Sequence, residues 1–397
     1  MDDLYLPCVR ASFSLMGTAR SIRAGAGKTL VIVGPASFEL TEGEASVLGA
    51  QLDSSKNIVP RGKQVPIEIQ SSSSFRISLG EDAGVEELDG STIPLSWVEA
   101  GSALVELGEG IVVVLGGADT GKTTLCTFLS NYLLSEDRQV AVVDADIGQT
   151  DLGPPTTMAA GEVRTKVTNL SQIKPSQRLF IGLTSPGYAK GKVVRSIKRL
   201  VGYHTKPGIT VIVNTDGWVS GSEAALYKLR MLDELHPDIT LGVGDGDISS
   251  ILETGNRATL LVGSPDTIKE RTRIDRRELR SLGYQKYLYG ASLRTFRMNG
   301  VKLRHCMATE GMNLGRVSQS SLDNLEDTIV GFLDANDLLQ EIGILKHVVP
   351  STRTVKIWSR VSNAPAKIEI GEVRLNSDGR ELGYLGDHGG TKVGRTY

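Results

Sequence analysis

The sequence has little cysteine. Only three cysteines occur among 397 residues, Cys8, Cys126 and Cys306, and they do not have the spacing of metal ligands. An odd number in so long a chain argues against a disulfide framework and fits a reducing compartment. No apolar run approaches about 20 residues, and no basic segment followed by an apolar stretch opens the chain, so we expect no membrane span and no signal peptide. These absences predict a cytoplasmic protein.

The chain also lacks a strong charge of either sign. Its 44 lysine and arginine residues nearly balance 46 aspartate and glutamate residues, which leaves a formal net charge of −2. This balance excludes a wholly basic protein that coats DNA, so a nucleic-acid partner would need a local basic groove. A length of 397 residues exceeds one ordinary core and predicts two or three domains.

Both ends of the chain have the pattern of β structure. In residues 1–95, short apolar or alternating runs are separated by glycine, proline and serine, as in Thr29–Val33, Val65–Ile69 and Ser74–Leu79. The signal returns in residues 291–397, with the runs Thr328–Leu333, Thr354–Trp358 and Lys367–Leu375. We therefore expect a small β domain at each end.

The middle of the chain, residues 96–290, has a different pattern. Helical patterns such as Val193–Val201 and Ser222–Leu235 alternate with continuous apolar runs. The apolar runs are Ile111–Leu115, Val140–Val143, Leu179–Leu183, Ile209–Val213, Ile239–Val243 and Thr259–Val262. Strands that are apolar on both faces and alternate with helices form parallel, doubly wound sheets. The middle segment therefore predicts an α/β domain with a parallel sheet.

A glycine-rich segment lies between the first of these apolar runs and a helical stretch, Lys122–Leu134. It has the full Walker A spacing, with the residues Gly116, Gly117, Ala118, Asp119, Thr120, Gly121, Lys122 and Thr123. Its glycines let backbone N–H groups converge on phosphate oxygens, and the helix N-terminus adds a favourable dipole. We expect Lys122 to reach the β- and γ-phosphates and Thr123 to bind Mg²⁺. The segment, which continues to Thr124, predicts that the domain binds ATP or GTP. Together with the strand patterns, it predicts a central P-loop kinase-type domain with a parallel sheet, flanked by small N- and C-terminal β domains.

A second glycine-rich segment, Gly25–Thr29, matches the same motif only in part. Ile22 takes the place of the first glycine, and a strand rather than a helix follows. We therefore predict a turn there and no phosphate binding.

Acidic residues follow the apolar run Val140–Val143. Asp144 stands at the tip of this strand, where Mg²⁺ or its water shell is held in P-loop proteins. Asp146 is placed to point toward the transferred phosphoryl group and to accept a proton from an attacking hydroxyl. Gln149 is a candidate to orient a water molecule or the γ-phosphate. The alternative is an acidic turn that only caps a helix.

Four segments together resemble the polynucleotide 5′-hydroxyl kinase family. They are GGADTGKTTLCTFLSNYLL, VAVVDADIGQTDLGPPTTM, VNTDGW and ERTRIDRRELRSLGYQKYLYG. The family includes the RNA kinase subunit of the eukaryotic pre-mRNA 3′-end cleavage complex, the nucleolar rRNA-processing kinase and archaeal relatives. The resemblance covers roughly residues 30–390, most specifically Gly116 to Gly290. It implies transfer of the ATP γ-phosphate to the 5′-hydroxyl of RNA or DNA, with Mg²⁺ and with protein partners in RNA processing.

The resemblance also implies roles for single residues. Asp146 looks like the general base. Asp144 and Asp146 lie in the Walker B element and are, with Thr123, the candidate Mg²⁺ ligands. On the nucleic-acid side, Gln149 matches the family's glutamine, Pro155, Thr156 and Thr157 resemble the clasp on the backbone, and Trp218 resembles the tryptophan that stacks on a terminal base. A plain loop at Pro154-Pro155 and a core position for Trp218 are the alternatives.

Arg271 and Arg276 match the lid arginines that the family places over the phosphates. Five of the ten residues Arg271–Arg280 are arginine. If the segment is helical throughout, Arg271 and Arg276 are splayed by about 140°; otherwise the helix begins between them. A solvated helix face is the alternative reading of so charged a run.

The leading hypothesis is an ATP-dependent polynucleotide 5′-hydroxyl kinase. One alternative is a P-loop ATPase that switches conformation, although Gly117, Ala118 and Asp119 stand where such proteins usually carry an extra lysine. The other is a non-catalytic, nucleotide-bound scaffold of an RNA-processing complex, against which the intact Lys122 and Asp146 argue. The choice between RNA and DNA, the nucleotide base, the pathway and the oligomeric state stay open.

Overall fold

The computed structural model describes residues 19–244, 247–253, 258–268, 270–298, 302–307 and 325–385. The chain divides into two compact units. The first comprises Met1–Gly153, Met158–Gln177 and Lys190–Leu279, and the second comprises Pro154–Thr157, Arg178–Ala189 and Arg280–Tyr397. The predicted domain boundaries near residues 95 and 290 stay a prediction, and Cys8 lies outside the described residues.

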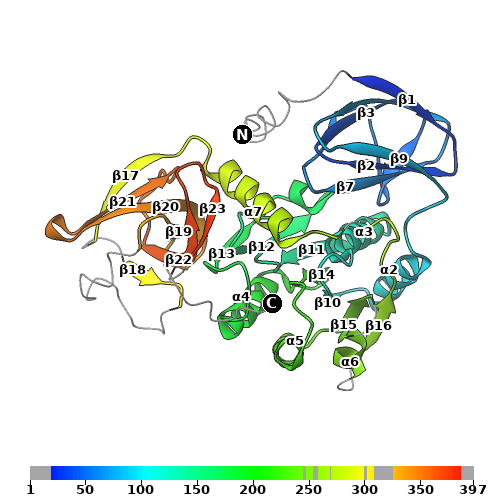
Figure 1. Ribbon diagram of the computed structural model, residues 1–397. Helices are drawn as coiled ribbons and strands as arrows, with labels where there is room; N and C mark the ends of the chain where they lie inside the picture. Colours follow the sequence, from blue (N-terminus) through cyan, green and yellow to red (C-terminus); the bar gives the residue numbers. More distant parts are fainter. Residues whose placement is uncertain are drawn as a thin grey trace. The chain divides into compact units, whose positions relative to one another are not determined.

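The first unit begins with two antiparallel sheets, drawn in blue in Figure 1. Their orders are β1-β8-β3-β6 and β5-β4-β7-β2-β9. The strands are β1 (Arg20–Ala24), β2 (Lys28–Val33), β3 (Ala36–Glu42), β4 (Ala45–Val47), β5 (Ala50–Gln51), β6 (Asn57–Val59), β7 (Gln64–Ile69), β8 (Ser73–Leu79) and β9 (Gly84–Asp89). In β7, Val65, Ile67 and Ile69 alternate into the core, as period-two patterning requires. The turn between β1 and β2 confirms that Gly25–Thr29 is not a second P-loop.

The central sheet of the first unit has the order β12-β11-β14-β10-β15-β16. Its strands are β10 (Gly110–Gly116), β11 (Gln139–Asp144), β12 (Thr157–Val163), β14 (Ile209–Asn214), β15 (Ile239–Val243) and β16 (Thr259–Val262). The strands β11, β14, β10, β15 and β16 are parallel, which confirms the expected fold class. The strand β12, which the sequence pattern did not predict, runs antiparallel to β11.

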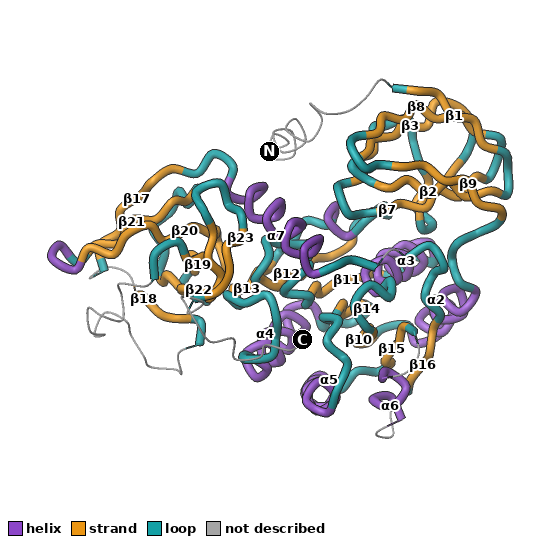
Figure 2. Tube along the Cα trace, in the orientation of Figure 1, coloured by secondary structure: helices purple, strands orange, loops and turns teal. Residues whose placement is uncertain are grey.

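Helices cover both faces of this sheet. They are α2 (Leu95–Leu107), α3 (Lys122–Ser135), α4 (Lys190–His204), α5 (Ser222–Leu235) and α6 (Asp247–Glu253), with the 3-10 helix η2 (Leu170–Gln172). In Figures 1 and 2, α2 and α3 lie together on one side and α4 and α5 together on the other. The chain leaves β10 toward β11 and leaves β14 toward β15, so it changes direction beside β10. The carboxyl ends of strands at such a switch point are where α/β proteins bind ligands.

The second unit is built around another sheet, with the order β17-β21-β20-β19-β22-β18 and with β23 beside β22. Its strands are β17 (Ser292–Arg297), β18 (Lys302–His305), β19 (Thr328–Leu333), β20 (Leu339–Val349), β21 (Thr354–Ser359), β22 (Lys367–Leu375) and β23 (Glu381–Tyr384), with the 3-10 helix η5 (Pro350–Thr352). The short strand β13 (Gln177–Phe180) replaces the expected run Leu179–Leu183. Helix α7 (Arg273–Leu288) belongs to the first unit up to Leu279 and to the second from Arg280. No helix within the described ranges is long and apolar enough to cross a membrane.

Candidate active site

The glycine-rich loop joins β10 to α3, as the sequence predicts. Asp119 (φ 55°) and Gly121 (φ 94°) both have left-handed backbone conformations. At Gly121 an added Cβ would also lie 3.0 Å from the Ile268 side chain, so conformation and space both require glycine. Such turns direct successive backbone N–H groups into a concave anion site.

Lys122 opens α3 and is buried, with 6% of its surface exposed. Its ammonium group donates a hydrogen bond to the backbone oxygen of Gly117 in the same loop. Burial lowers the pKa of Lys122, and the nearby charge of Asp146 opposes that shift. The lysine is therefore held at the loop, where a phosphate oxygen can take the place of the Gly117 carbonyl as its acceptor.

Asp144, at the end of β11, is fully buried and richly hydrogen-bonded. Its Oδ2 accepts from Thr150 Oγ1 at 2.8 Å and from the Asp151 backbone N–H at 2.6 Å. Burial, and next the charge of Asp151, raise the pKa of Asp144 to about 6. Asn214 Nδ2 is 3.1 Å from Asp144 Oδ1 and 3.3 Å from Thr123 Oγ1. One amide group therefore connects Thr123 and Asp144, two of the three side chains that the sequence proposes for Mg²⁺; Asp146 is the third.

Asp146 lies just beyond β11 and is only partly buried. Its Oδ1 accepts from the backbone N–H groups of Gly148, at 3.1 Å, and Gln149, at 3.0 Å. Burial raises the pKa of Asp146, and Lys122 opposes the shift. A carboxylate with a raised pKa beside the phosphate lysine has the properties of a general base.

The two lid arginines lie at the P-loop. Helix α7 begins at Arg273, between Arg271 and Arg276, which is the second of the two arrangements that the sequence allows. Arg276 Nη2 donates to Asp119 Oδ2 at 2.6 Å, and Arg271 Nη1 lies 3.5 Å from Asp119 Oδ1. The Gln149 side-chain amide donates to the backbone oxygen of Arg276 at 3.2 Å. The first unit therefore brings together the P-loop, Gln149 and both lid arginines.

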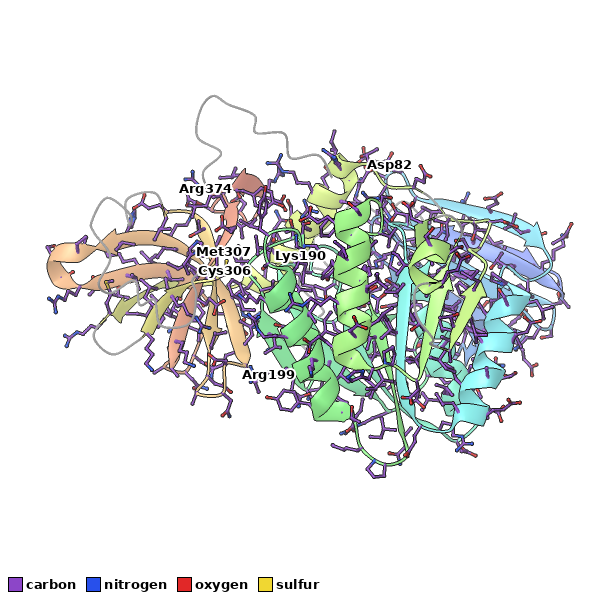
Figure 3. All side chains as sticks on the ribbon, turned by 90° about the horizontal axis from the view of Figure 1, so that it is seen from below. Asp82, Lys190, Arg199, Cys306, Met307 and Arg374 are labelled. Carbon is purple, nitrogen blue, oxygen red and sulfur yellow. The ribbon has the colours of Figure 1, made fainter. Side chains whose placement is uncertain are left out.

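Trp218 follows β14 at the same edge of the sheet and is partly exposed. Its ring stacks on Tyr227, with centroids 5.7 Å apart and planes inclined by 26°. Lys190 Nζ, at the start of α4 and labelled in Figure 3, lies 5.6 Å from the centroid of the Trp218 ring. The partial exposure of the indole leaves a face for a further aromatic group, and its role in base stacking stays a prediction.

A buried ionic network supports the Trp218 loop. Asp216 Oδ1 accepts from the Trp218 backbone N–H at 3.0 Å, while Oδ2 accepts from Tyr227 at 2.8 Å and lies 3.1 Å from Lys228 Nζ. Lys228 is fully buried; burial lowers its pKa, and Asp216 opposes that shift. The sequence reading missed Lys228, because a lysine on an amphipathic helix ordinarily faces solvent.

Gly217 is required at this loop. An added Cβ there would lie 2.7 Å from the backbone of Ala118. The glycine therefore lets the loop after β14 lie directly against the P-loop.

The proposed clasp residues belong to the second unit. Thr156 has a left-handed backbone (φ 72°), and the side chains of Thr156 and Thr157 are fully buried. The Thr156 carbonyl accepts from the backbone N–H groups of Ile181, at 2.9 Å, and Gly182, at 3.0 Å. These contacts give the segment a defined turn, and nucleic-acid binding by Pro155, Thr156 and Thr157 stays a prediction.

The fold and this site define a P-loop nucleotide-binding protein of the kinase type. Residues 116–290 match the family model of the mRNA cleavage and polyadenylation factor CLP1 P-loop. The chain is 25% identical over 319 residues to the polyribonucleotide 5′-hydroxyl-kinase of Pyrococcus horikoshii. This match covers 69% of this chain and 88% of that protein. It is 26% identical over 323 residues to the polyribonucleotide 5′-hydroxyl-kinase of Methanocaldococcus jannaschii, and the match covers 69% of this chain and 89% of that protein.

Eukaryotic proteins and a solved structure match as well. A CLP1 homologue of Culex quinquefasciatus is 28% identical over 197 residues, which are 46% of this chain and 46% of that protein. A chain of the solved complex of Clp1p with Pcf11p (454–563) has the same fold, with a TM-score of 0.69 and 15% identity over 90% of this chain and 98% of that one. The sequence and family-model matches support the similarity to the polynucleotide 5′-hydroxyl kinase family that the motifs indicate.

Proposed function

We propose that this protein is an ATP-dependent polynucleotide 5′-hydroxyl kinase. The observation that carries the proposal is the placement of three cations, Lys122, Arg271 and Arg276, at the P-loop, together with the carboxylate of Asp146, whose charge acts on Lys122 and whose pKa burial raises. A nucleotide-hydrolysing switch needs the cations but no base for a polynucleotide hydroxyl. The names of the archaeal relatives point to the same acceptor.

In this reaction the 5′-oxygen of the polynucleotide forms a bond to the γ-phosphorus. The bond from that phosphorus to the β–γ bridging oxygen breaks, and ADP leaves. The 5′-hydroxyl proton passes to the carboxylate of Asp146. Lys122 and the two lid guanidinium groups stabilise the negative charge that spreads over the equatorial oxygens.

The donor set also fits Mg²⁺, which the family uses with ATP. Thr123 offers a hydroxyl and Asp144 a carboxylate, and these hard oxygen ligands are the kind that Mg²⁺ prefers. Asn214 already connects the two side chains. When bound, the ion would supply charge neutralisation between the β- and γ-phosphates.

On the acceptor side, we assign Trp218 to the terminal base and Gln149, Pro155, Thr156 and Thr157 to the nucleic-acid backbone. The support for Trp218 is its partly exposed ring at the same sheet edge as Asp146. We also propose an RNA-processing role with protein partners, because the matched fold is that of Clp1p, solved in complex with Pcf11p.

The test is a transfer assay with γ-labelled ATP and matched 5′-hydroxyl oligonucleotides of RNA and DNA. We expect label at the 5′ end of one or both, and none on oligonucleotides that already carry a 5′-phosphate. Label that appears only as inorganic phosphate would indicate the ATPase switch, and bound but unreacted ATP would indicate the scaffold.

A further inference from the structure

Asp119 is an unexpected side chain for its place in the P-loop. It sits two residues before Gly121 and three before Lys122, in a loop built to bind anionic phosphates. Only 8% of its side chain is exposed. A buried carboxylate is costly unless it is paired, and one beside a phosphate cradle also repels the ligand. Its position therefore requires a compensating interaction.

The lid supplies a compensating interaction. Asp119 Oδ2 accepts from Arg276 Nη2 at 2.6 Å and from the Arg271 backbone N–H at 2.9 Å. Arg271 Nη1 is 3.5 Å from Asp119 Oδ1. One carboxylate thus binds the two arginines that the reaction needs, on either side of the first residue of α7.

Other contacts hold the same segment without supplying charge. Arg271 Nη2 donates to the backbone oxygen of Gly62 at 2.8 Å, and Gln64 Nε2 donates to that of Thr267 at 2.6 Å. Gln149 holds the backbone of Arg276. The bonds from Gln64 and Gln149 fix the course of the backbone. The Arg271 guanidinium is shared between the Gly62 carbonyl and Asp119, whereas the guanidinium of Arg276 is directed by Asp119.

We propose that Asp119 is the positioning residue of the lid: its carboxylate holds the Arg271 and Arg276 guanidinium groups at the P-loop in the productive place for phosphoryl transfer. The proposal rests on the proposed kinase function. A guanidinium has five N–H donors, and Arg276 uses one nitrogen on Asp119, which leaves Nη1 and Nε for phosphate oxygens. The arginines can thus contact the phosphates while Asp119 keeps them oriented.

This arrangement separates turnover from nucleotide affinity. Without the carboxylate, the guanidinium groups lose their orientation, and catalysis depends steeply on orientation. Ground-state affinity has the opposite tendency, because a negative charge beside the phosphates is removed. The structure therefore predicts a loss in kcat without a matching rise in KM for ATP.

The kinetic test is a double-mutant cycle of Asp119→Asn with Arg276→Ala. Asparagine keeps the shape and tolerates the left-handed backbone. Asp137→Asn is the matched control, since Asp137 is exposed and has nearly the same φ of 54°. We expect Asp119→Asn to lower kcat, and with it the single-turnover transfer rate, by about tenfold or more, while KM for ATP changes less than about threefold. In the Arg276→Ala background the same change should cost clearly less, because only the orientation of Arg271 is then left to lose. Equal losses in both backgrounds would overturn the proposal.

A second measurement does not depend on transfer activity. Amide hydrogen exchange of residues 271–276 is compared in the nucleotide-free wild type, Asp119→Gly and the control Asp137→Gly, glycine being free to adopt the left-handed conformation. We expect exchange at least about tenfold faster in Asp119→Gly alone, because the Arg271 amide loses its acceptor. Unchanged hydrogen exchange in Asp119→Gly would overturn the proposal. If exchange in Asp119→Gly is faster but the wild-type protein transfers no phosphate, only the kinase function is rejected.

Discussion

Two aspartates follow neighbouring strands of the central sheet and differ in how their charge is compensated. Asp146, after β11, is held by the backbone N–H groups of Gly148 and Gln149. Asp216, after β14, is bound by the phenol of Tyr227 and the fully buried ammonium of Lys228. Both belong to the same sheet edge, yet only Asp216 has a dedicated cation.

The difference teaches which carboxylate is committed to holding the structure. The buried ion pair with Lys228 and the bond to the Trp218 backbone fix Asp216 and the Trp218 loop, so the role of Asp216 is structural. Asp146 shares the charge of Lys122, which the phosphates of ATP would engage. Under the proposed function, binding of nucleotide would leave the Asp146 carboxylate able to accept the proton of a hydroxyl group.

The largest effect on transfer should come from Lys122→Ala, which removes the cation whose charge acts on Asp146. We expect transfer to fall to background and ATP binding to weaken, because the buried phosphates lose their main cation. Single-turnover transfer and equilibrium ATP binding measure the two effects. Wild-type turnover in this variant would remove the P-loop from the mechanism.

The single variants Asp146→Asn and Asp216→Asn test the comparison between the two aspartates directly. Asp146→Asn should lower turnover roughly 10²–10⁴-fold with ATP affinity largely kept, as expected for a lost base. Because burial raises the pKa of Asp146, wild-type turnover should fall as the pH drops through a value above the usual carboxyl range. The variant Asp146→Asn should lose the part of that limb that Asp146 causes, while the part caused by Asp144, whose pKa burial raises to about 6, should remain.

Asp216→Asn should instead act on stability, by about 3–5 kcal/mol, because Lys228 is left as an unpaired buried charge. Chemical denaturation measures the loss. The comparison fails if Asp216→Asn keeps full stability while removing the acid limb of the pH profile.

A smaller effect is expected from the lid. Arg271→Ala and Arg276→Ala should each reduce the transfer rate by about tenfold or more with little change in ATP affinity, since the charge they bind grows at the transition state. Arg276→Lys should not fully rescue, because an ammonium lacks the planar fork. Arg277→Ala, at an exposed position of the same helix, is the control. Wild-type rates in both alanine variants would make the segment a solvated helix.

The smallest effect concerns the loop that Asp216 supports. Trp218→Ala should weaken oligonucleotide binding by about 1–3 kcal/mol, the worth of one base stack, and leave ATP binding nearly unchanged. Trp358→Ala provides a matched control, because Trp358 is also partly exposed but lies on β21 of the second unit. A collapse of ATP affinity with unchanged oligonucleotide affinity would instead place Trp218 on the nucleotide side.

The sequence anticipated the elements whose signal is local. Runs apolar on both faces predicted β10, β14 and β15 almost to the residue, since parallel strands are buried on both sides. The edge strand β16 was predicted equally well, although its Leu260 and Leu261 are exposed. It missed β12, whose central residues Ala159, Ala160 and Gly161 are small and have weak strand preference. The antiparallel direction of β12 depends on pairing with β11, which no local pattern encodes.

The candidate site likewise has a part that local sequence signals predict and a part that depends on contacts between distant segments. The P-loop was predictable because its spacing and its flanking strand and helix lie within one short segment. Asn214 between Thr123 and Asp144, Lys228 under Asp216, and Asp119 between the lid arginines join segments far apart in the chain. Of these, only Asn214 carried a usable signal, because it ends the strand beside β11 and so must meet Asp144.

The central claim, that Asp146 and the P-loop act together in phosphoryl transfer to a 5′-hydroxyl, is tested most directly by product stoichiometry. Purified full-length protein, ATP, Mg²⁺ and a 5′-hydroxyl oligonucleotide are incubated, and ADP and 5′-phosphorylated ends are both quantified. The account predicts one 5′-phosphate for each ADP in the wild type and neither product in Lys122→Ala. ADP formed without 5′-phosphorylated RNA or DNA would contradict it.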